Sequence, residues 1–173
     1  MMKNLLKILA VIIILFLIFI IYIYSGSYNI SAMVPHNKLT RWVIGVTTDN
    51  SIKHHSKNIT VPNLNDDAMI KMGAAHYKEM CVDCHGAPGI PQDEIAKGLY
   101  PKPPVLARTV HEWTPAELFW MTKNGIKMTG MPAWGTTHSD EKIWALVAFM
   151  EKLPNMTPEE FNNLVKDVKA DND

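Results

Sequence analysis

The 173-residue chain contains no more than two cysteines, Cys81 and Cys84, and this scarcity excludes several kinds of site. A zinc site built on such a pair needs two further ligands, and the sequence offers neither more cysteines nor two histidines at the required spacing. A thioredoxin-like dithiol site needs a preceding strand, whereas a helical pattern precedes Cys81. A disulfide between the two residues would close a small, strained ring. The pair therefore needs another explanation.

Acidic residues are scarce in the first 65 positions, which contain one acid, Asp49, and six lysines and arginines. The rest of the chain holds eleven basic and sixteen acidic side chains, so the net charge is +5 in the first part and −5 in the second. Because no basic stripe lies on the part predicted to fold, we expect no nucleic-acid partner.

Charge is missing altogether from the seventeen residues between Ile8 and Tyr24, nearly all of which are large and apolar. A membrane-spanning helix needs about 20 such residues, and the leucines before this run extend it. Lys3 and Lys7 predict that the N-terminus stays inside the cell. We therefore expect a single-pass anchor with the remainder outside, and cleavage as a signal peptide near residues 25–27 is the alternative.

The two cysteines belong to Cys81-Val82-Asp83-Cys84-His85, which reads C-x-x-C-H and is the attachment signature of a c-type haem. Residues three apart lie on one face of a helical turn, so both thiols can reach the two vinyl groups on one edge of a haem. His85 follows at once and is placed to ligate the iron. The motif predicts one covalently attached haem c.

The pattern after the apolar run is helical and predicts an all-α fold. We divide the chain into an anchor (1–24), a linker or amphipathic segment (25–65), a main domain (66–154) and a short C-terminal helix with a polar tail (155–173). Signals that begin helices occur at Asn65 or Asp66, in the capping boxes Thr114–Glu117 and Thr157–Glu160, and at Ser139. In the helix that leads to Cys81 the expected packing face comprises Ala68, Met69, Met72, Gly73, Ala75, Tyr77 and Met80.

The segment 25–65 admits two interpretations. An apolar stripe at helical spacing is formed by Leu39, Trp42, Val43, Val46 and Ile52. Such a helix either packs against the main domain or lies on the membrane or on a partner protein. The adjacent His54 and His55 lack a third ligand nearby, so a solvated polar face is expected there rather than a metal site.

A second axial ligand for the iron is expected on the loop Gly130-Met131-Pro132, which glycine and proline bound on either side. Met131 is therefore the preferred ligand, and Met128 is the nearest rival. His111 and His138 would give a bis-histidine site instead. His76 lies on the helix that delivers His85, so it cannot reach the opposite face of the haem.

These motifs make the chain resemble the class I c-type cytochromes, in particular the single-haem, membrane-anchored bacterial kind grouped with the haem subunits of cbb3-type cytochrome c oxidases. The resemblance covers about residues 66–154. It rests on the C-x-x-C-H motif, on Pro104-Val105-Leu106, on Gly130-Met131-Pro132 and on the apolar helix around 146–149.

The resemblance implies a small cytochrome c fold around the haem and a set of site residues. Cys81 and Cys84 would hold the haem, and His85 and Met131 would ligate its iron. The Pro104 carbonyl would accept a hydrogen bond from His85 and fix its tautomer. Leu106 and Trp134 would pack beside the haem and its ligand. Gly73 and Tyr77 would cross the last core helix near Ala145 and Phe149.

With both axial positions filled, one-electron transfer is the expected function, and no catalytic residue or small-molecule substrate is expected. The predicted partners are the membrane and redox proteins such as an oxidase, a dehydrogenase or another cytochrome. The predicted location is the bacterial inner membrane, with the haem domain on the periplasmic side. Two alternatives are a haem sensor or small peroxidase in which Met131 dissociates, and a fixed subunit of a membrane oxidoreductase.

Overall fold

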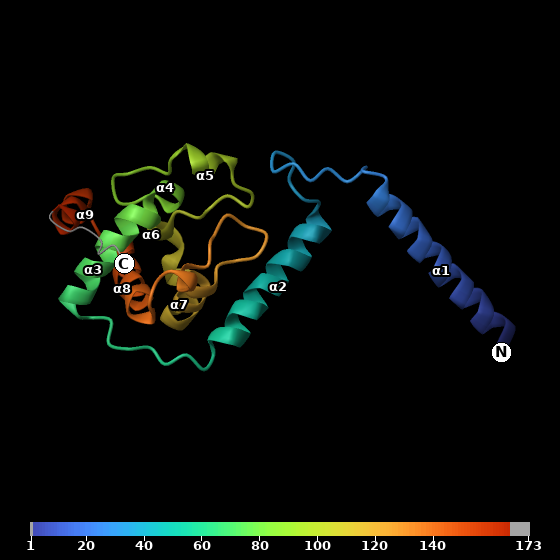
Figure 1. Cartoon of the computed structure of the whole chain (residues 1–173), viewed down its shortest axis with the longest axis horizontal. Helices are drawn as coiled ribbons and strands as arrows, with labels where there is room; N and C mark the ends of the chain where they lie inside the picture. The colour runs from blue at the N-terminus through green and yellow to red at the C-terminus, as the bar shows by residue number, and fades with distance from the viewer. Residues whose placement is uncertain (1, 167–173) are drawn as a thin grey trace. The chain divides into compact units, whose positions relative to one another are not determined.

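A computed structural model describes residues 2–166 and divides them into two compact units, which begin at the N-terminus and at Pro35 (Figure 1). The first unit contains α1 (Met2–Tyr24). The longer helices of the second unit are α2 (Lys38–Ser56), α3 (Asp67–Met80), α7 (Pro115–Asn124), α8 (Asp140–Met150) and α9 (Pro158–Val165). Its short helices are α4 (Val82–His85), α5 (Glu94–Gly98), α6 (Leu106–Thr109) and the 3-10 turns Val110–Glu112, Trp134–Thr136 and Leu153–Asn155.

The described residues form no strand, and their sole bridge pairs Ala87 with Ile90, so the all-α prediction is confirmed. The most apolar 18-residue window of helix α1 has a mean hydropathy of 3.2, and no residue of the helix is buried. Its 23 residues give a length of about 35 Å, enough for a hydrocarbon core of about 30 Å. A signal sequence has the same character, so length and composition support either role.

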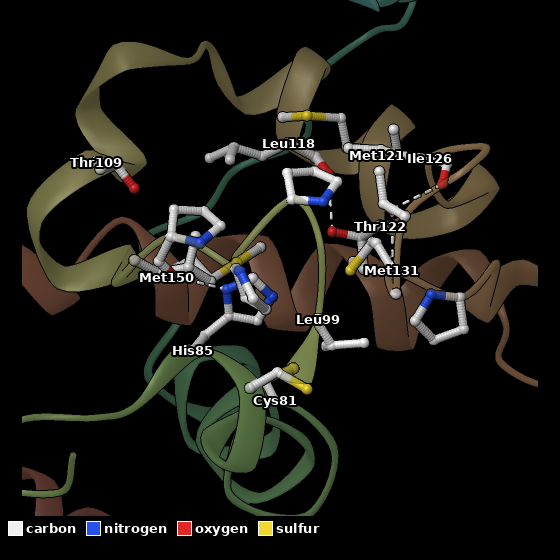
Figure 2. Close-up of a pocket in the computed structure, with 18 of the residues that line it drawn as sticks. Cys81, His85, Leu99, Thr109, Leu118, Met121, Thr122, Ile126, Met131 and Met150 are labelled. Atoms are coloured by element: carbon white, nitrogen blue, oxygen red, sulfur yellow. Dashed lines mark hydrogen bonds between the residues drawn. The ribbon is translucent and has the colours of Figure 1, made fainter. Parts of the chain in front are cut away.

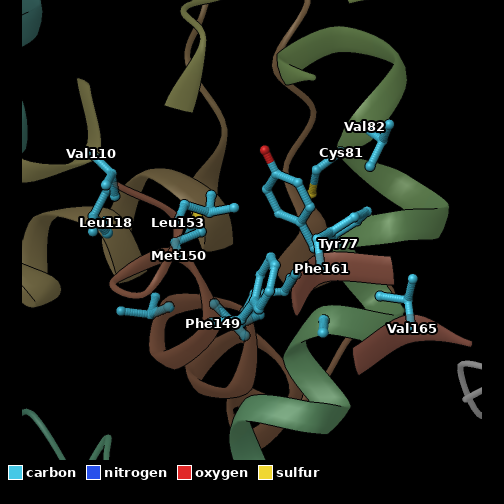
Figure 3. Close-up of a cluster of buried hydrophobic side chains, with 14 of the residues drawn as sticks. Tyr77, Cys81, Val82, Val110, Leu118, Phe149, Met150, Leu153, Phe161 and Val165 are labelled. Atoms are coloured by element: carbon cyan, nitrogen blue, oxygen red, sulfur yellow. The ribbon is translucent and has the colours of Figure 1, made fainter. Parts of the chain in front are cut away.

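The centre of the second unit is the crossing of α3 and α8, where Gly73 lets the two backbones approach. The rings of Tyr77 and Phe149 lie 5.1 Å apart at this crossing, as expected. Phe161 of α9 completes the cluster, with its ring 6.1 Å from that of Phe149 (Figure 3). Helix α8 is apolar almost all round because neighbours cover it on most sides, and all but Trp144 of residues 143–150 are buried.

The predicted packing face of α3 is partly wrong. Its buried residues form the unbroken run Gly73–Tyr77, whereas Ala68 and Met72 are exposed. The reason is that α3 contacts both α8 and α9, so its central turn is covered around most of its circumference. A single stripe is the pattern of a helix covered from one side.

Helix α2 packs against α7, and Ile52 is the one residue of its predicted apolar stripe that is buried. Ile52 and Ser56 are buried, and the imidazole of His55 stacks on the indole of Trp120 with ring centroids 5.5 Å apart. The other stripe residues are exposed: Leu39, Trp42, Val43 and Val46. Of the two interpretations, packing on the main domain is the one seen in the structure, and the expected apolar face is corrected.

Most helix ends lie where their capping residues placed them. Asp66 accepts hydrogen bonds at the start of α3, and Ser139 does so at the start of α8. Thr114 and Thr157 close capping boxes at α7 and α9, and α7 ends at Gly125. The short helices α5 and α6 are not among those that the sequence signals predicted, and Asp93 caps the first of them. The predicted polar tail 170–173 lies outside the described residues.

Candidate haem site

The C-x-x-C-H motif lies where α3 passes into the short helix α4. Cys81 ends α3 with its N–H bonded to the Tyr77 carbonyl at 2.9 Å, and His85 closes the next turn onto the Cys81 carbonyl at 2.8 Å. Both cysteines are free thiols, Cys81 buried and Cys84 half-buried. The helical turn therefore presents two thiols and an imidazole from five consecutive residues.

The imidazole of His85 is held by the backbone of a distant loop. Its Nδ1 lies 2.8 Å from the Pro104 carbonyl oxygen. Because a carbonyl oxygen can accept a hydrogen bond but cannot donate one, Nδ1 carries the proton. Nε2 then keeps the lone pair that binds a metal. Burial lowers the pKa of His85 and the Pro104 carbonyl opposes that shift, so the neutral ligand form is favoured at neutral pH.

Two further side chains hold the motif in place. Gln92 Nε2 donates to the Cys84 carbonyl at 2.7 Å and to the Pro103 carbonyl at 2.8 Å, which joins the turn to the loop that binds His85. The hydroxyl of Tyr77 donates a buried hydrogen bond of 2.7 Å to the Gly86 carbonyl. The sequence did not reveal the role of Gln92, because no local pattern indicates that its amide bonds to carbonyls before and after it in the chain.

A mostly apolar cleft opens beside the motif and holds about 990 Å³ of empty space, part of it open to solvent (Figure 2). Its walls come from α3, α4, α7, α8 and the loops 99–106 and 126–134. The predicted site residues Cys81, Cys84, His85, Pro104, Leu106, Met131 and Trp134 all line it. Three distant parts of the chain, 81–85, 104–106 and 131–134, therefore converge on one space.

Several methionines reach this cleft. Met131 lines it, and Figure 2 shows His85 and Met131 on different sides of the space, with Cys81 between them. Met80, Met121 and Met150 also line it, and sequence reasoning did not consider them as ligands. Each lies within or at the end of a core helix, where a methionine is typical core filler.

The loop that carries Met131 is fastened at several points. The Met131 N–H bonds to the Thr129 hydroxyl at 3.0 Å, and its carbonyl accepts from the Ile126 N–H at 3.3 Å. Gly125 adopts a φ of +64°, and a Cβ there would come within 2.8 Å of the Met131 carbonyl oxygen. Proline follows Met131, so the backbone that presents this thioether is well restrained.

The rival ligands lie elsewhere. Met128 is 77% exposed and outside the lining of the cleft. Among the residues that the structure describes, the cleft lining also excludes His76, His111 and His138. His76 is buried with its ring 5.7 Å from that of His138, and neither of these histidines lines the cleft.

The chemistry of the donor set fits a covalently bound haem better than a bare metal ion. Burial, followed by the neighbouring Cys84, raises the pKa of the Cys81 thiol to about 12, so this side chain is a neutral thiol at pH 7. Within residues 2–166 no three histidine, cysteine or acidic side chains gather as a metal site. A large apolar cleft with two thiols at one edge and an oriented imidazole matches a macrocycle.

The comparison with known families agrees with this geometry. The family model described as cytochrome c oxidase, cbb3-type, subunit III matches residues 68–150. No significant match was found among curated proteins or among solved structures. The matched segment runs from α3 to the end of α8 and includes both cysteines, His85 and Met131. Residues 68–150 are therefore similar to this family, and the chain contains a class I c-type cytochrome domain, an electron-transfer domain that carries covalently bound haem c.

Proposed function

We propose that the protein is a membrane-anchored, mono-haem cytochrome that carries single electrons between respiratory redox partners. The observation that carries the proposal is that His85 and Met131 line one cleft together with both cysteines. When bound there, haem c supplies an iron that accepts and returns one electron. The proposal assigns the two thioethers to Cys81 and Cys84 and the axial positions to His85 and Met131.

The chain's own residues would keep the site rigid and dry. The Pro104 carbonyl fixes the tautomer and ring plane of His85. Gln92 links the turn that carries Cys84 and His85 to the loop that carries Pro104. The His85 imidazole and the carbonyl that holds it therefore keep their relative positions. Leu106, Leu118 and Met150 line the cleft with apolar surface, which would keep water away from the part of a bound haem that they cover. A thioether ligand raises the reduction potential relative to a second imidazole.

Two filled axial positions leave no open site for a substrate, which favours electron transfer over peroxide or gas chemistry. The test is the addition of carbon monoxide to the reduced protein, followed by its haem spectrum. An electron carrier binds it poorly, whereas a sensor or peroxidase with a labile Met131 binds it readily. Rapid, complete binding by the wild-type protein would overturn the carrier proposal.

A fixed place in a larger complex is the second candidate, because the matching family model is described as an oxidase subunit. Purification in mild detergent separates the two. A free carrier elutes alone, whereas a subunit brings a stoichiometric set of further membrane proteins, and their identity names the redox partner.

The proposed anchor is α1, with its N-terminus inside the cell and the haem domain on the periplasmic side of a bacterial inner membrane. The expectation rests on the uncharged run behind Lys3 and Lys7. A reporter that is active outside the cytoplasm should be active when fused after Asp173, and the protein should stay in membranes after a carbonate wash. Release of a soluble species that begins near Tyr28 would identify a cleaved signal instead.

A further inference from the structure

Helix α2 has two different faces, and the packed face is not the more apolar one. Ile52 and Ser56 are buried against the domain. The opposite face carries the α2 stripe, which we define as Leu39, Trp42, Val43 and Val46, with exposed fractions of 69%, 64%, 47% and 42%. At 100° per residue these four side chains fall within an arc of about 100°, the width of a typical buried helix face.

The charges of α2 suit an anionic surface. Lys38, Arg41, Lys53 and Lys57 lie on this helix or at its end, against Asp49 as the one acid. The helical repeat places the exposed Lys53 and Lys57 on the same side as the α2 stripe, about two and three turns beyond Val46. Helices that lie in a membrane interface combine apolar residues such as Trp and Leu with lysines and arginines, and α2 carries both kinds of residue.

Chain length limits how far this helix can move from a bilayer. Thirteen residues, 25–37, separate the end of α1 from the start of α2. Fully extended, such a segment spans no more than about 45 Å. If α1 is anchored, the linker therefore keeps the start of α2 within about 45 Å of the membrane end of α1, which leaves a bilayer contact within reach.

We propose that the α2 stripe is a docking surface for an anionic lipid bilayer, with Trp42 at the level of the headgroups and Lys53 and Lys57 on lipid phosphates. The proposal rests on the proposed anchor and goes beyond it by assigning a second, peripheral contact. Tryptophan is enriched at this depth because its ring is apolar and its N–H is polar.

The docking has a consequence for the haem site, because α2 is attached to the domain near both of its ends. The His36 N–H bonds to the Tyr100 hydroxyl at 3.0 Å, and Tyr100 lies between two residues that line the cleft. At the other end His55 stacks on Trp120 of α7, the helix that contributes a cleft wall. A bilayer contact through the α2 stripe would thus fix the direction in which the haem cleft faces.

The test uses the full holoprotein in vesicles of phosphatidylethanolamine and phosphatidylglycerol. Since the haem occupies both native cysteines, Val46→Cys provides one thiol for a nitroxide label. Ile13→Cys in α1 serves as the lipid-buried reference, and the exposed Glu159→Cys in α9 serves as the water reference. Power-saturation electron paramagnetic resonance then compares collisions with oxygen, which enters lipid, and with a nickel chelate, which stays in water.

We expect the oxygen-to-nickel ratio at Val46 to lie well above that at Glu159 and below that at Ile13. A ratio equal to that at Glu159, with Ile13 buried in lipid, would overturn the proposal while leaving the anchor intact. Protection of Val46 from both reagents would indicate a protein contact, with a second copy or a partner, and would also overturn it. A water-exposed Ile13 label would refute the anchor itself.

A charge variant checks the lipid specificity. Lys53→Glu with Lys57→Glu should lower the ratio at Val46, as should replacement of the anionic lipid by phosphatidylcholine. The matched control is Lys97→Glu with Lys127→Glu, two exposed lysines outside α2, and it should leave the ratio unchanged. Equal effects of the two pairs would show a general electrostatic attraction and would overturn the assignment to α2.

Discussion

Gly73 of α3 lies directly against the carbonyl of Ala145 in α8, so that a Cβ on Gly73 would overlap that backbone oxygen. The Cβ of Phe149 would lie 2.9 Å from the same position. A glycine inside a helix costs about 1 kcal/mol relative to alanine. The close crossing, which positions Cys81 at the cleft, offsets this cost.

Gly73→Ala should therefore lower the free energy of unfolding by about 3 kcal/mol or more, because the neighbouring atom is backbone and cannot turn aside. The matched control is Gly45→Ala in α2, where a Cβ meets nothing within 4 Å. It should raise stability by about 0.5–1 kcal/mol. Urea unfolding of the holoproteins measures both, and equal effects of the two substitutions would contradict the crossing. If Gly73→Ala prevents folding, the yield of haem protein gives the same comparison.

Acid should weaken the start of α9 through the capping box of Thr157 and Glu160. Hydrogen bonds from Thr157 to the Glu160 carboxylate lower its pKa below the ordinary value of 4.5. A depressed pKa in the folded state stabilises the fold above the unfolded-state pKa, and this contribution is lost as the pH falls through the folded-state pKa. Glu160→Gln should lower the melting temperature at pH 7 more than Glu159→Gln does, and the difference should narrow in acid. A difference that is constant with pH would exclude the carboxylate as its cause.

Gln92→Ala should loosen the site without removing any proposed ligand. The substitution deletes hydrogen bonds to two carbonyls, at a cost of about 1–3 kcal/mol in total. Glu94→Ala in α5, an exposed neighbour, is the control. Urea unfolding should separate the two variants, and equal stabilities would show that the bridge is not formed in solution.

Sequence patterns were most informative where a few consecutive residues determine the structure. The capping residues Thr114, Ser139 and Thr157 and the cysteine motif are all of this kind, and the first three begin helices as predicted. The packed face of α2 was predicted wrongly because His55 meets Trp120, which lies far along the chain. An apolar stripe indicates a face that avoids water, but it does not identify the surface that covers it.

Within the cleft, too, local sequence patterns did not reveal contacts between distant parts of the chain. The spacing of the C-x-x-C-H motif dictates its own geometry, and the glycine and proline around Met131 indicate a stiff loop. No local pattern reveals that Met80, Met121 and Met150 line the same space, because they belong to three different helices. The choice of Met131 among these side chains therefore needs an experiment.

Covalent attachment is tested by the cysteines. Because each thioether needs one thiol, Cys81→Ala or Cys84→Ala should leave at most one covalent bond and largely abolish maturation. Denaturing gels stained for haem peroxidase activity measure the remaining attachment. Undiminished staining in the double variant would show that the haem is held in another way.

The choice of Met131 as the second axial ligand carries the most weight for function. Oxidised wild-type protein should show the weak sulfur-to-iron charge-transfer band in the far red. Met131→His should keep a low-spin haem but lower the potential, because imidazole stabilises the ferric state. Met131→Ala should open the position and let the reduced haem bind carbon monoxide readily.

Two controls make this assignment specific. Met128→Ala should change little, because that side chain is exposed and lies outside the cleft lining. Met121→Leu, which keeps the apolar volume of a cleft-lining residue, should preserve the far-red band. If Met131→Ala kept both the band and the wild-type potential, the ligand would have to be another methionine. Loss of the far-red band in Met121→Leu would then identify Met121 of helix α7 as the axial ligand.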